Sequence, residues 1–453
     1  MNIFDNLKIG GQWWDPKYPS KKIGGVLEVK PSHSIMLTLF GKIAEHENSY
    51  SNVICGLTET GKRISLFGPR SWGRGTVYYG DDESDTVYSE RLKFESMLEG
   101  CHKHSEDSLL YDHISVEFDC LYEWTELTNY RREESSHSLD KQIIVYGDMK
   151  AEKIDIGVLN IEFNVLKEMS WSNTDPKISQ RLEVNLSNGS SFTPEFAYKN
   201  IGILRGFFRT FIGQEVNVEL ITLHNTTTKE SVRFLSPRTY IRKRKEPFDF
   251  NQAFFSYKSL RQNLVNILMK WFRYSKEFPT LFTRYVWYLD ASEAVMESRL
   301  LAIIQCFEGF HREFERGSYL SSNEYEVLKF EILKNLPKIE DKSLLSKIGT
   351  TLDHVNEYSL RKRLSLYIEE QKSFIIFWIS DSKDFARRIS DWRNIQSHGL
   401  THGDEFPYKE IGIYQLRLEI LTAMLLISHI GLPPSAVSQR ARSLWKFGKP
   451  IML

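Results

Sequence analysis

The chain has 453 residues, of which 41% are hydrophobic and 26% are charged, a balance typical of a globular protein with two or three domains and not of a disordered one. Lys and Arg together number 59, and so do Asp and Glu, so any surface that attracts a polyanion must be local. Four cysteines do not make a disulfide framework, and no basic head followed by an apolar segment opens the sequence, so we expect a cytoplasmic protein.

The first half of the chain alternates between apolar and polar residues with a period of two, which predicts β-strands. Between two of these runs, the turn Thr58–Lys62 predicts a hairpin with Gly61 at a left-handed position. Many short strands favour a sandwich or an open barrel. We expect strands at 35–40, 53–57, 63–67, 113–121, 142–146, 158–163 and 214–222, within a β-rich domain covering residues 1–240.

One helix is expected inside this β-rich half. Thr193 is a capping residue, Pro194 suits the first helical position, and Gly213 ends the segment. Trp13 and Trp14 favour buried anchors of this domain over an exposed binding surface.

A basic segment predicts the domain boundary, with a linker at 241–250. It contains four consecutive basic residues, Arg242, Lys243, Arg244 and Lys245. These residues form either a solvated linker or a strip that contacts the phosphates of bound RNA.

After Phe250 the apolar residues recur with a helical period, so residues 251–453 are predicted to form an all-helical bundle. The apolar run 420–432 is interrupted by Ser428 and His429 and is shorter than the roughly 20 residues of a membrane span, so no membrane partner is expected. We expect helices at 254–271, 294–314, 360–368, 382–398 and 414–430, and another that begins near Ser322.

The predicted helix 382–398 carries an unusual polar line. Phe385, Ile389 and Trp392 form its apolar stripe. The opposite side carries Arg387, Asp391, Asn394 and His398 at helical spacing. The position of His398 in the last turn favours the imidazolium form, since the helix dipole stabilises a cation there.

Such a histidine suits cleavage of RNA by its own 2′-hydroxyl group. That reaction needs a base for the 2′ proton, an acid for the 5′-oxygen and a cation for the crowded phosphate. One helix offers only one such histidine, and a two-fold dimer would supply a second. Arg393 is also a candidate cation, although it flanks the apolar stripe and does not lie on the polar line.

Two stretches of the sequence resemble a known family. The segment RNIQSH, Arg393 to His398, matches the Arg-Asn-x3-His signature of HEPN domains, which are helical bundles that often act as metal-independent endoribonucleases when dimerised. The stretch from Gly10 to Gly41 resembles the opening of the N-terminal domain of ApeA-type anti-phage proteins, in which a β-rich domain precedes a HEPN domain.

This resemblance implies a fold of the α+β multidomain class and an anti-phage (abortive-infection) endoribonuclease that needs no cofactor. The family's catalytic arginine, polar residue and histidine correspond to Arg393, Asn394 and His398. The implied partners are RNA, with transfer RNA a frequent target of related HEPN effectors, a second copy of the C-terminal domain, and a phage-derived trigger for the N-terminal domain.

Simpler interpretations of the same residues stay open. His398 also suits a helix C-cap, and Asn394 suits an exposed helical position. Asp391 and Arg387 suit a surface ion pair as well as a supporting role, and His402 suits a loop as well as a second base. The alternative function is that of a catalytically silent HEPN-type adaptor that binds RNA or protein. A zinc site is not expected, because the spacing fits no standard finger among Cys101, His102, His104, His113 and Cys120.

Overall fold

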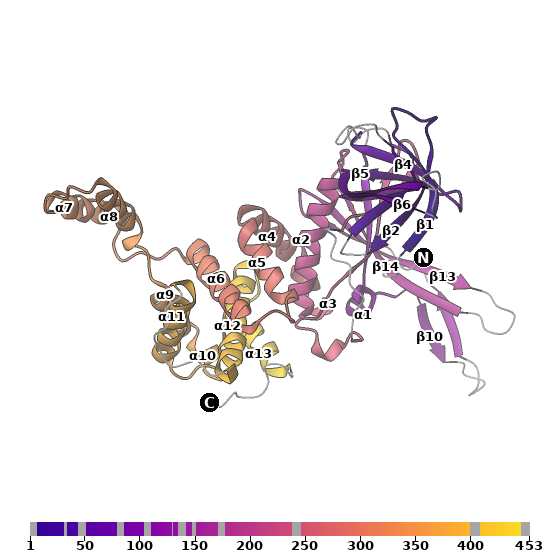
Figure 1. Cartoon of the computed structure of the whole chain (residues 1–453). Coiled ribbons are helices and arrows are strands. Elements are labelled where there is room, and N and C mark those ends of the chain that lie inside the picture. Colours follow the sequence, from indigo (N-terminus) through magenta and orange to yellow (C-terminus); the bar gives the residue numbers. More distant parts are fainter. Residues whose placement is uncertain are drawn as a thin grey trace. The chain divides into compact units, whose positions relative to one another are not determined.

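The computed structural model describes residues 7–30, 34–43, 51–78, 86–103, 110–128, 130–134, 142–146, 151–170, 177–237, 246–398 and 408–444. The chain divides into two compact units, residues 1–269 and 270–453 (Figure 1). The first unit is built mainly from strands and the second from helices, which confirms the predicted fold class.

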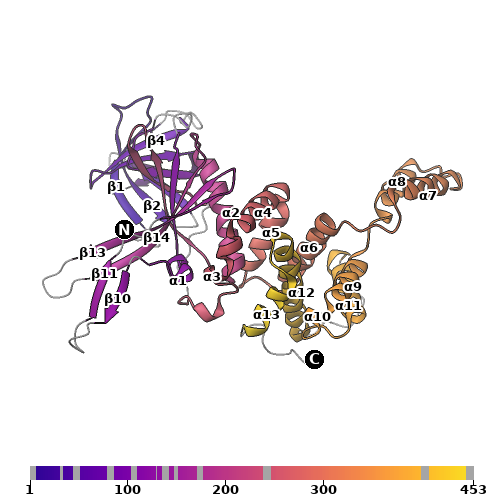
Figure 2. The ribbon, with the colours of Figure 1, turned by 180° about the vertical axis from the view of Figure 1, so that it is seen from behind.

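The described part of the first unit contains a fourteen-stranded sheet in which the paired strands are antiparallel. Its order is β12-β13-β14-β9-β15-β16-β8-β5-β4-β1-β2-β3-β7-β6. Strands β10 and β11 pair separately and lie side by side in Figure 2. The bounds are β1 Leu7–Trp14, β2 Ile23–Lys30, β3 Ser34–Leu39, β4 Val53–Thr58, β5 Arg63–Phe67, β6 Arg70–Tyr78, β7 Thr86–Phe94, β8 Ser96–Glu99, β9 His113–Phe118, β10 Tyr130–Glu134, β11 Gln142–Tyr146, β12 Glu152–Asp155, β13 Asn160–Ser170, β14 Lys177–Ser187, β15 Val218–Asn225 and β16 Glu230–Leu235.

The predicted local signals of this unit agree with the structure. Gly61 has a φ of 78° in the β4–β5 turn, where the amide of Thr58 donates to the carbonyl of Lys62 at 3.0 Å. Trp13 is fully buried, and its indole N–H donates to the carbonyl of Gly25 at 3.2 Å. Trp14 is also buried, so both tryptophans are anchors of the core.

Helix α2 (Pro194–Ile212) has the predicted bounds and packs on the sheet. The hydroxyl of Thr193 accepts a hydrogen bond from the amide of Phe196 at 3.4 Å, and Gly213 ends the helix in the left-handed region. The ring of Phe208 makes edge contacts with Phe118 of β9 and Phe163 of β13. The predicted strand 113–121 is shorter, because the chain turns at the left-handed Cys120 into the short helix α1 (Leu121–Thr125). The predicted strands 158–163 and 214–222 begin later, at Asn160 and Val218, and each extends further along the chain.

The segment that follows the basic stretch also packs on the first unit. The amides of Phe254 and Phe255 donate to carbonyls at the end of α2, at 2.8 and 2.7 Å. The indole of Trp124 donates to the carbonyl of Phe255 at 2.7 Å, and the ring of Tyr257 in α3 (Tyr257–Leu260) packs edge-on against it. The two units therefore divide after Met269, later than the linker that the basic residues suggested at 241–250.

The second unit is helical, and α6 packs against α5, α9, α11 and α12. Helix α4 begins just before the division between the units. The bounds are α4 Leu264–Glu277, α5 Pro279–Asp290, α6 Met296–Glu315, α7 Ser322–Lys334, α8 Lys342–Val355, α9 Leu360–Glu370, α10 Lys372–Ile375, α11 Ser382–His398, α12 Tyr408–Ile430 and α13 Pro434–Ser443.

Helix α12 is long and apolar enough to cross a membrane by length and composition, over Glu410–Ile430. However, 72% of that segment is buried inside the protein. The apolar residues of α12 are therefore covered within the chain itself, since α12 packs against α6 and α13. They give no separate reason to expect a subunit interface.

Helices α7 and α8 form a hairpin at one end of the second unit (Figure 1). Two connecting segments, residues 316–321 and 356–359, join this hairpin to the rest of the bundle, and they lie side by side because Ser318 pairs with Glu357. We call these two segments the neck. Arg363 of α9 is fully buried beneath the neck. Its guanidinium donates to the carbonyl of Tyr358 at 2.9 Å and to the carbonyl of Arg316, so it ties both segments of the neck to the bundle.

Candidate active site on helix α11

Helix α11 begins and ends at the predicted residues, Ser382 and His398. The carboxylate of Asp381 caps its first turn, because Oδ1 accepts from the amides of Lys383 and Asp384 at 3.0 Å each. The predicted apolar stripe is confirmed. Its three members each expose 3% or less of their surface, namely Phe385, Ile389 and Trp392.

Arg393 lies at the edge of this buried stripe, and its side chain is 37% exposed. Its Nη2 atom is 3.7 Å from Oε2 of Glu308 on α6, and its Nη1 atom donates to Oδ1 of Asn394 at 3.4 Å. Because Arg393 lies beside the apolar stripe and not on the polar line, its guanidinium points toward α6. Asn394 is exposed on the outer side of the helix.

The carboxylate of Glu308 bridges two arginines. Its Oε2 atom faces Arg393, and its Oε1 atom accepts from Nη2 of Arg312 at 3.3 Å. Arg312 in turn pairs with Glu357 of the neck at 2.9 Å. Because the side chain of Glu308 is only 13% exposed, it forms a fixed negative charge against which the Arg393 guanidinium is oriented.

Sequence reasoning missed Glu308. The only local signal is that Glu308 and Arg312 are four residues apart on one helix, a spacing that predicts an ion pair but no link to the motif. The contact with Arg393 joins distant parts of the chain.

Arg387 and Asp391 form the surface ion pair that was one interpretation of their spacing. Nη1 of Arg387 lies 3.5 Å from Asp391, and Nη2 lies 2.7 Å from Asp384, at the start of the same helix. The hydrogen bond from Arg387 lowers the pKa of Asp384 below its ordinary value, with Arg388 adding to the effect against the opposing effect of burial. Within the described residues, both ion-pair partners of Arg387 therefore lie on α11 itself.

The remaining predicted site residues lie largely outside the described part of the chain. His398 ends α11, but its side chain is not among the described ones. His402 falls in 399–407, and the basic residues Arg242, Lys243, Arg244 and Lys245 fall in 238–245, both outside the described residues. The structure thus brings together Arg393, Asn394 and Glu308 and leaves the placement of the histidine as a prediction.

The described residues contain no group of three or more His, Cys, Asp or Glu side chains that could hold a metal ion. None of the four cysteines forms a disulfide bond, and all four are buried. Burial raises the pKa of the Cys55 thiol to about 11, and burial together with the charge of Glu230 raises that of Cys101 to about 12. Cys55 and Cys101 are therefore core residues in their neutral form.

Comparison with protein families gives two matches. Residues 8–271 match the ApeA N-terminal domain 1, and residues 301–435 match the Apea-like HEPN domain. Neither the curated proteins nor the solved structures give a match. The second match covers α11 and residues 301–315 of α6, so Arg393, Asn394 and Glu308 all lie inside the HEPN region. The chain therefore belongs to the ApeA family, with an ApeA N-terminal domain followed by an ApeA-like HEPN domain.

Proposed function

We propose that this protein is an anti-phage endoribonuclease that cleaves RNA by attack of the 2′-hydroxyl group on the adjacent phosphate, without a metal ion. The observation that carries the proposal is the Arg393 guanidinium, partly exposed near the end of α11 and held between Asn394 and the Glu308 carboxylate. Family membership supports it, because HEPN domains are commonly ribonucleases.

Each residue has a distinct role in this reaction. The 2′-oxygen forms a bond to phosphorus while the bond to the 5′-oxygen breaks, which yields a cyclic phosphate and a free 5′-hydroxyl. Arg393 stabilises the negative charge that develops on the phosphoryl oxygens. Asn394 and Glu308 orient Arg393. His398 transfers protons, as a base toward the 2′-oxygen or an acid toward the 5′-oxygen.

A homodimer through residues 251–453 completes the proposed site. Two proton transfers are needed and each chain supplies one His398, so two α11 helices that face each other across a two-fold axis would provide a base and an acid. Asn394 and Asp391 are exposed on α11, which leaves this side of the helix open to a partner or to RNA.

The β-rich unit is proposed to sense infection and to control the HEPN domain. Its matched segment, residues 8–271, covers all of the fourteen-stranded sheet except Leu7. The proposed trigger is a phage-derived component, and the proposed site of action is the cytoplasm. Transfer RNA is the proposed target by analogy with other HEPN effectors.

Purified protein incubated with total RNA, with and without phage components, tests the proposal. Arg393→Ala and His398→Ala should each lower cleavage by about 10²-fold or more. Lys347→Ala is the control, since Lys347 is an exposed cation of α8, in the hairpin that α7 and α8 form. Circular dichroism should show all three variants folded. RNA left intact by the wild-type protein under every condition would contradict the proposal and favour a silent adaptor.

A further inference from the structure

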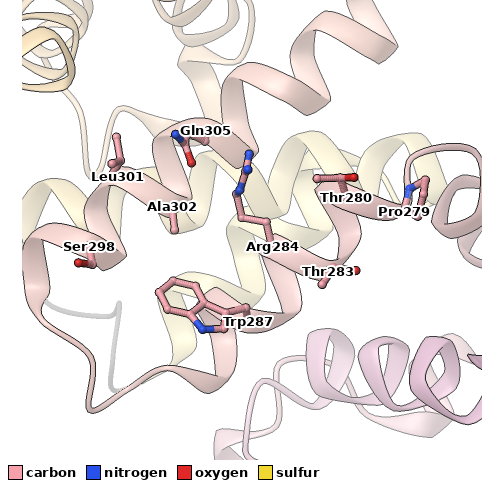
Figure 3. Close-up of a pocket in the computed structure, with 9 residues that line it drawn as sticks. All are labelled: Pro279, Thr280, Thr283, Arg284, Trp287, Ser298, Leu301, Ala302 and Gln305. Atoms are coloured by element: carbon pink, nitrogen blue, oxygen red, sulfur yellow. The ribbon is translucent and has the colours of Figure 1, made fainter. Parts of the chain in front are cut away.

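A groove runs along α5 and α6 in the second unit. It has a volume of about 620 Å³. Figure 3 shows the side chains that line it, with Arg284 of α5 reaching toward Gln305 of α6 and Trp287 lying nearer Ala302 and Ser298. Thr280, Ser298 and Leu301 also line the groove.

The chemistry of the groove suits a nucleotide. Trp287 is 45% exposed although it is large and apolar, so its ring offers a face on which a base can stack. Arg284 is only partly exposed and, within the described part of the chain, pairs with no carboxylate. A guanidinium held in a groove without a counterion attracts a phosphate. The amide of Gln305 and the hydroxyl of Thr280 can pair with base or sugar edges.

The groove also leads to the candidate active site. Leu301, Gln305 and Glu308 follow i, i+4 and i+7 on α6, so they lie on one face of that helix. Leu301 and Gln305 line the groove, and Glu308 contacts Arg393. Since side chains three residues apart on a helix are neighbours, about 5–6 Å between Cβ atoms, one end of the groove lies beside the catalytic arginine.

We infer that this groove is a nucleotide subsite of the RNA substrate. One unpaired base stacks on Trp287, its phosphate lies against Arg284, and the strand continues along α6 to the phosphate that Arg393 stabilises. This inference rests on the proposed function. It adds a substrate class, RNA with an unpaired nucleotide next to the cleaved bond, because a base within a duplex cannot stack on a protein ring.

Binding of a labelled single-stranded RNA oligonucleotide, measured by fluorescence anisotropy, tests the inference. The His398→Ala protein is the parent, so that the RNA is not cleaved during the titration. Trp287→Ala should weaken binding by about fivefold or more, the loss expected when one stacked base is released. Arg284→Ala should weaken it by about fivefold or more as well, because the phosphate loses charge-assisted hydrogen bonds to the guanidinium. Trp287→Phe should restore most of the affinity, since a phenyl ring still stacks.

Two controls match these changes. Phe330→Ala removes an exposed aromatic ring from α7, 63% exposed, and Lys347→Ala removes an exposed cation from α8. Neither should change the affinity, and thermal melting should show every variant folded. A parent that binds RNA while Trp287→Ala and Arg284→Ala bind it equally well would overturn the subsite and leave the proposed ribonuclease intact. A wild-type protein that leaves RNA uncut and a parent that does not bind it would overturn both.

Discussion

Replacement of Glu308 by glutamine tests whether Glu308 orients Arg393 for cleavage or only stabilises the fold. The substitution keeps the size of the side chain and removes the charge that faces both Arg393 and Arg312. We expect the variant to fold and to bind RNA at least as well as the wild type, because the site loses a negative charge. Cleavage should nevertheless fall, since the guanidinium is no longer held against a carboxylate.

The structure sets the size of each effect. At the 3.7 Å separation of Arg393 and Glu308, Coulomb's law gives between about 1 and 4 kcal/mol for effective dielectric constants of about 80 and 20. Because the arginine side chain is 37% exposed, screening reduces this to about 1 kcal/mol or less. For a unit of this size, that loss lowers Tm by about 2–4 °C. A displacement of the guanidinium by about 1 Å, in contrast, costs on the order of 10²-fold in rate.

Cleavage kinetics and thermal melting of Glu308→Gln measure the two effects side by side. The expected result is a kcat about tenfold to 10²-fold lower, a KM that does not rise, and a small change in Tm. Glu313→Gln is the matched control, since Glu313 is an exposed carboxylate on the same helix and should show wild-type behaviour. A wild-type kcat in Glu308→Gln would refute the positioning role, and so would a large fall in Tm that accounts for the lost activity.

Three further predictions follow from the site and the bundle. Cleavage should survive EDTA and leave a 2′,3′-cyclic phosphate and a 5′-hydroxyl, as end-group analysis will show; a 5′-phosphate with strict metal dependence would point to another active site. When His398→Ala chains are mixed with wild type, activity should fall faster than the wild-type fraction, whereas a linear decline would contradict a site shared between two chains. Burial, reinforced by Arg363, lowers the pKa of His311 from 6.5 to about 4. The unfolded chain therefore binds more protons between about pH 4 and 6.5, so stability should fall as the pH falls through that range, by at most about 3 kcal/mol. Urea titrations of His311→Phe should show a flatter pH profile, and an unchanged profile would contradict the assignment.

Much of the fold could be predicted where local signals agree with one another. Helix α11 has its predicted bounds because its apolar stripe and polar line follow one period, and α2 because Thr193, Pro194 and Gly213 mark both of its ends. Helix α8 was missed, since none of its residues is buried and the burial of an apolar stripe is what makes a helix recognisable in a sequence. The pairing of Glu308 with Arg393 was also missed, because residues on two helices become neighbours only when the bundle forms.

The neck beneath α7 and α8 has a consequence for how this protein can vary. Ser318 and Glu357 pair directly, so the chain returns to the bundle at the point where it left. The groups that Arg363 holds, the carbonyls of Arg316 and Tyr358, both lie on the bundle side of that pair. A tight turn can therefore replace residues 320–356, or a longer or different domain can be inserted there, while the path of every core helix stays the same. We therefore expect the bundle to fold without the hairpin, and we expect length differences among relatives to concentrate between Ser318 and Glu357.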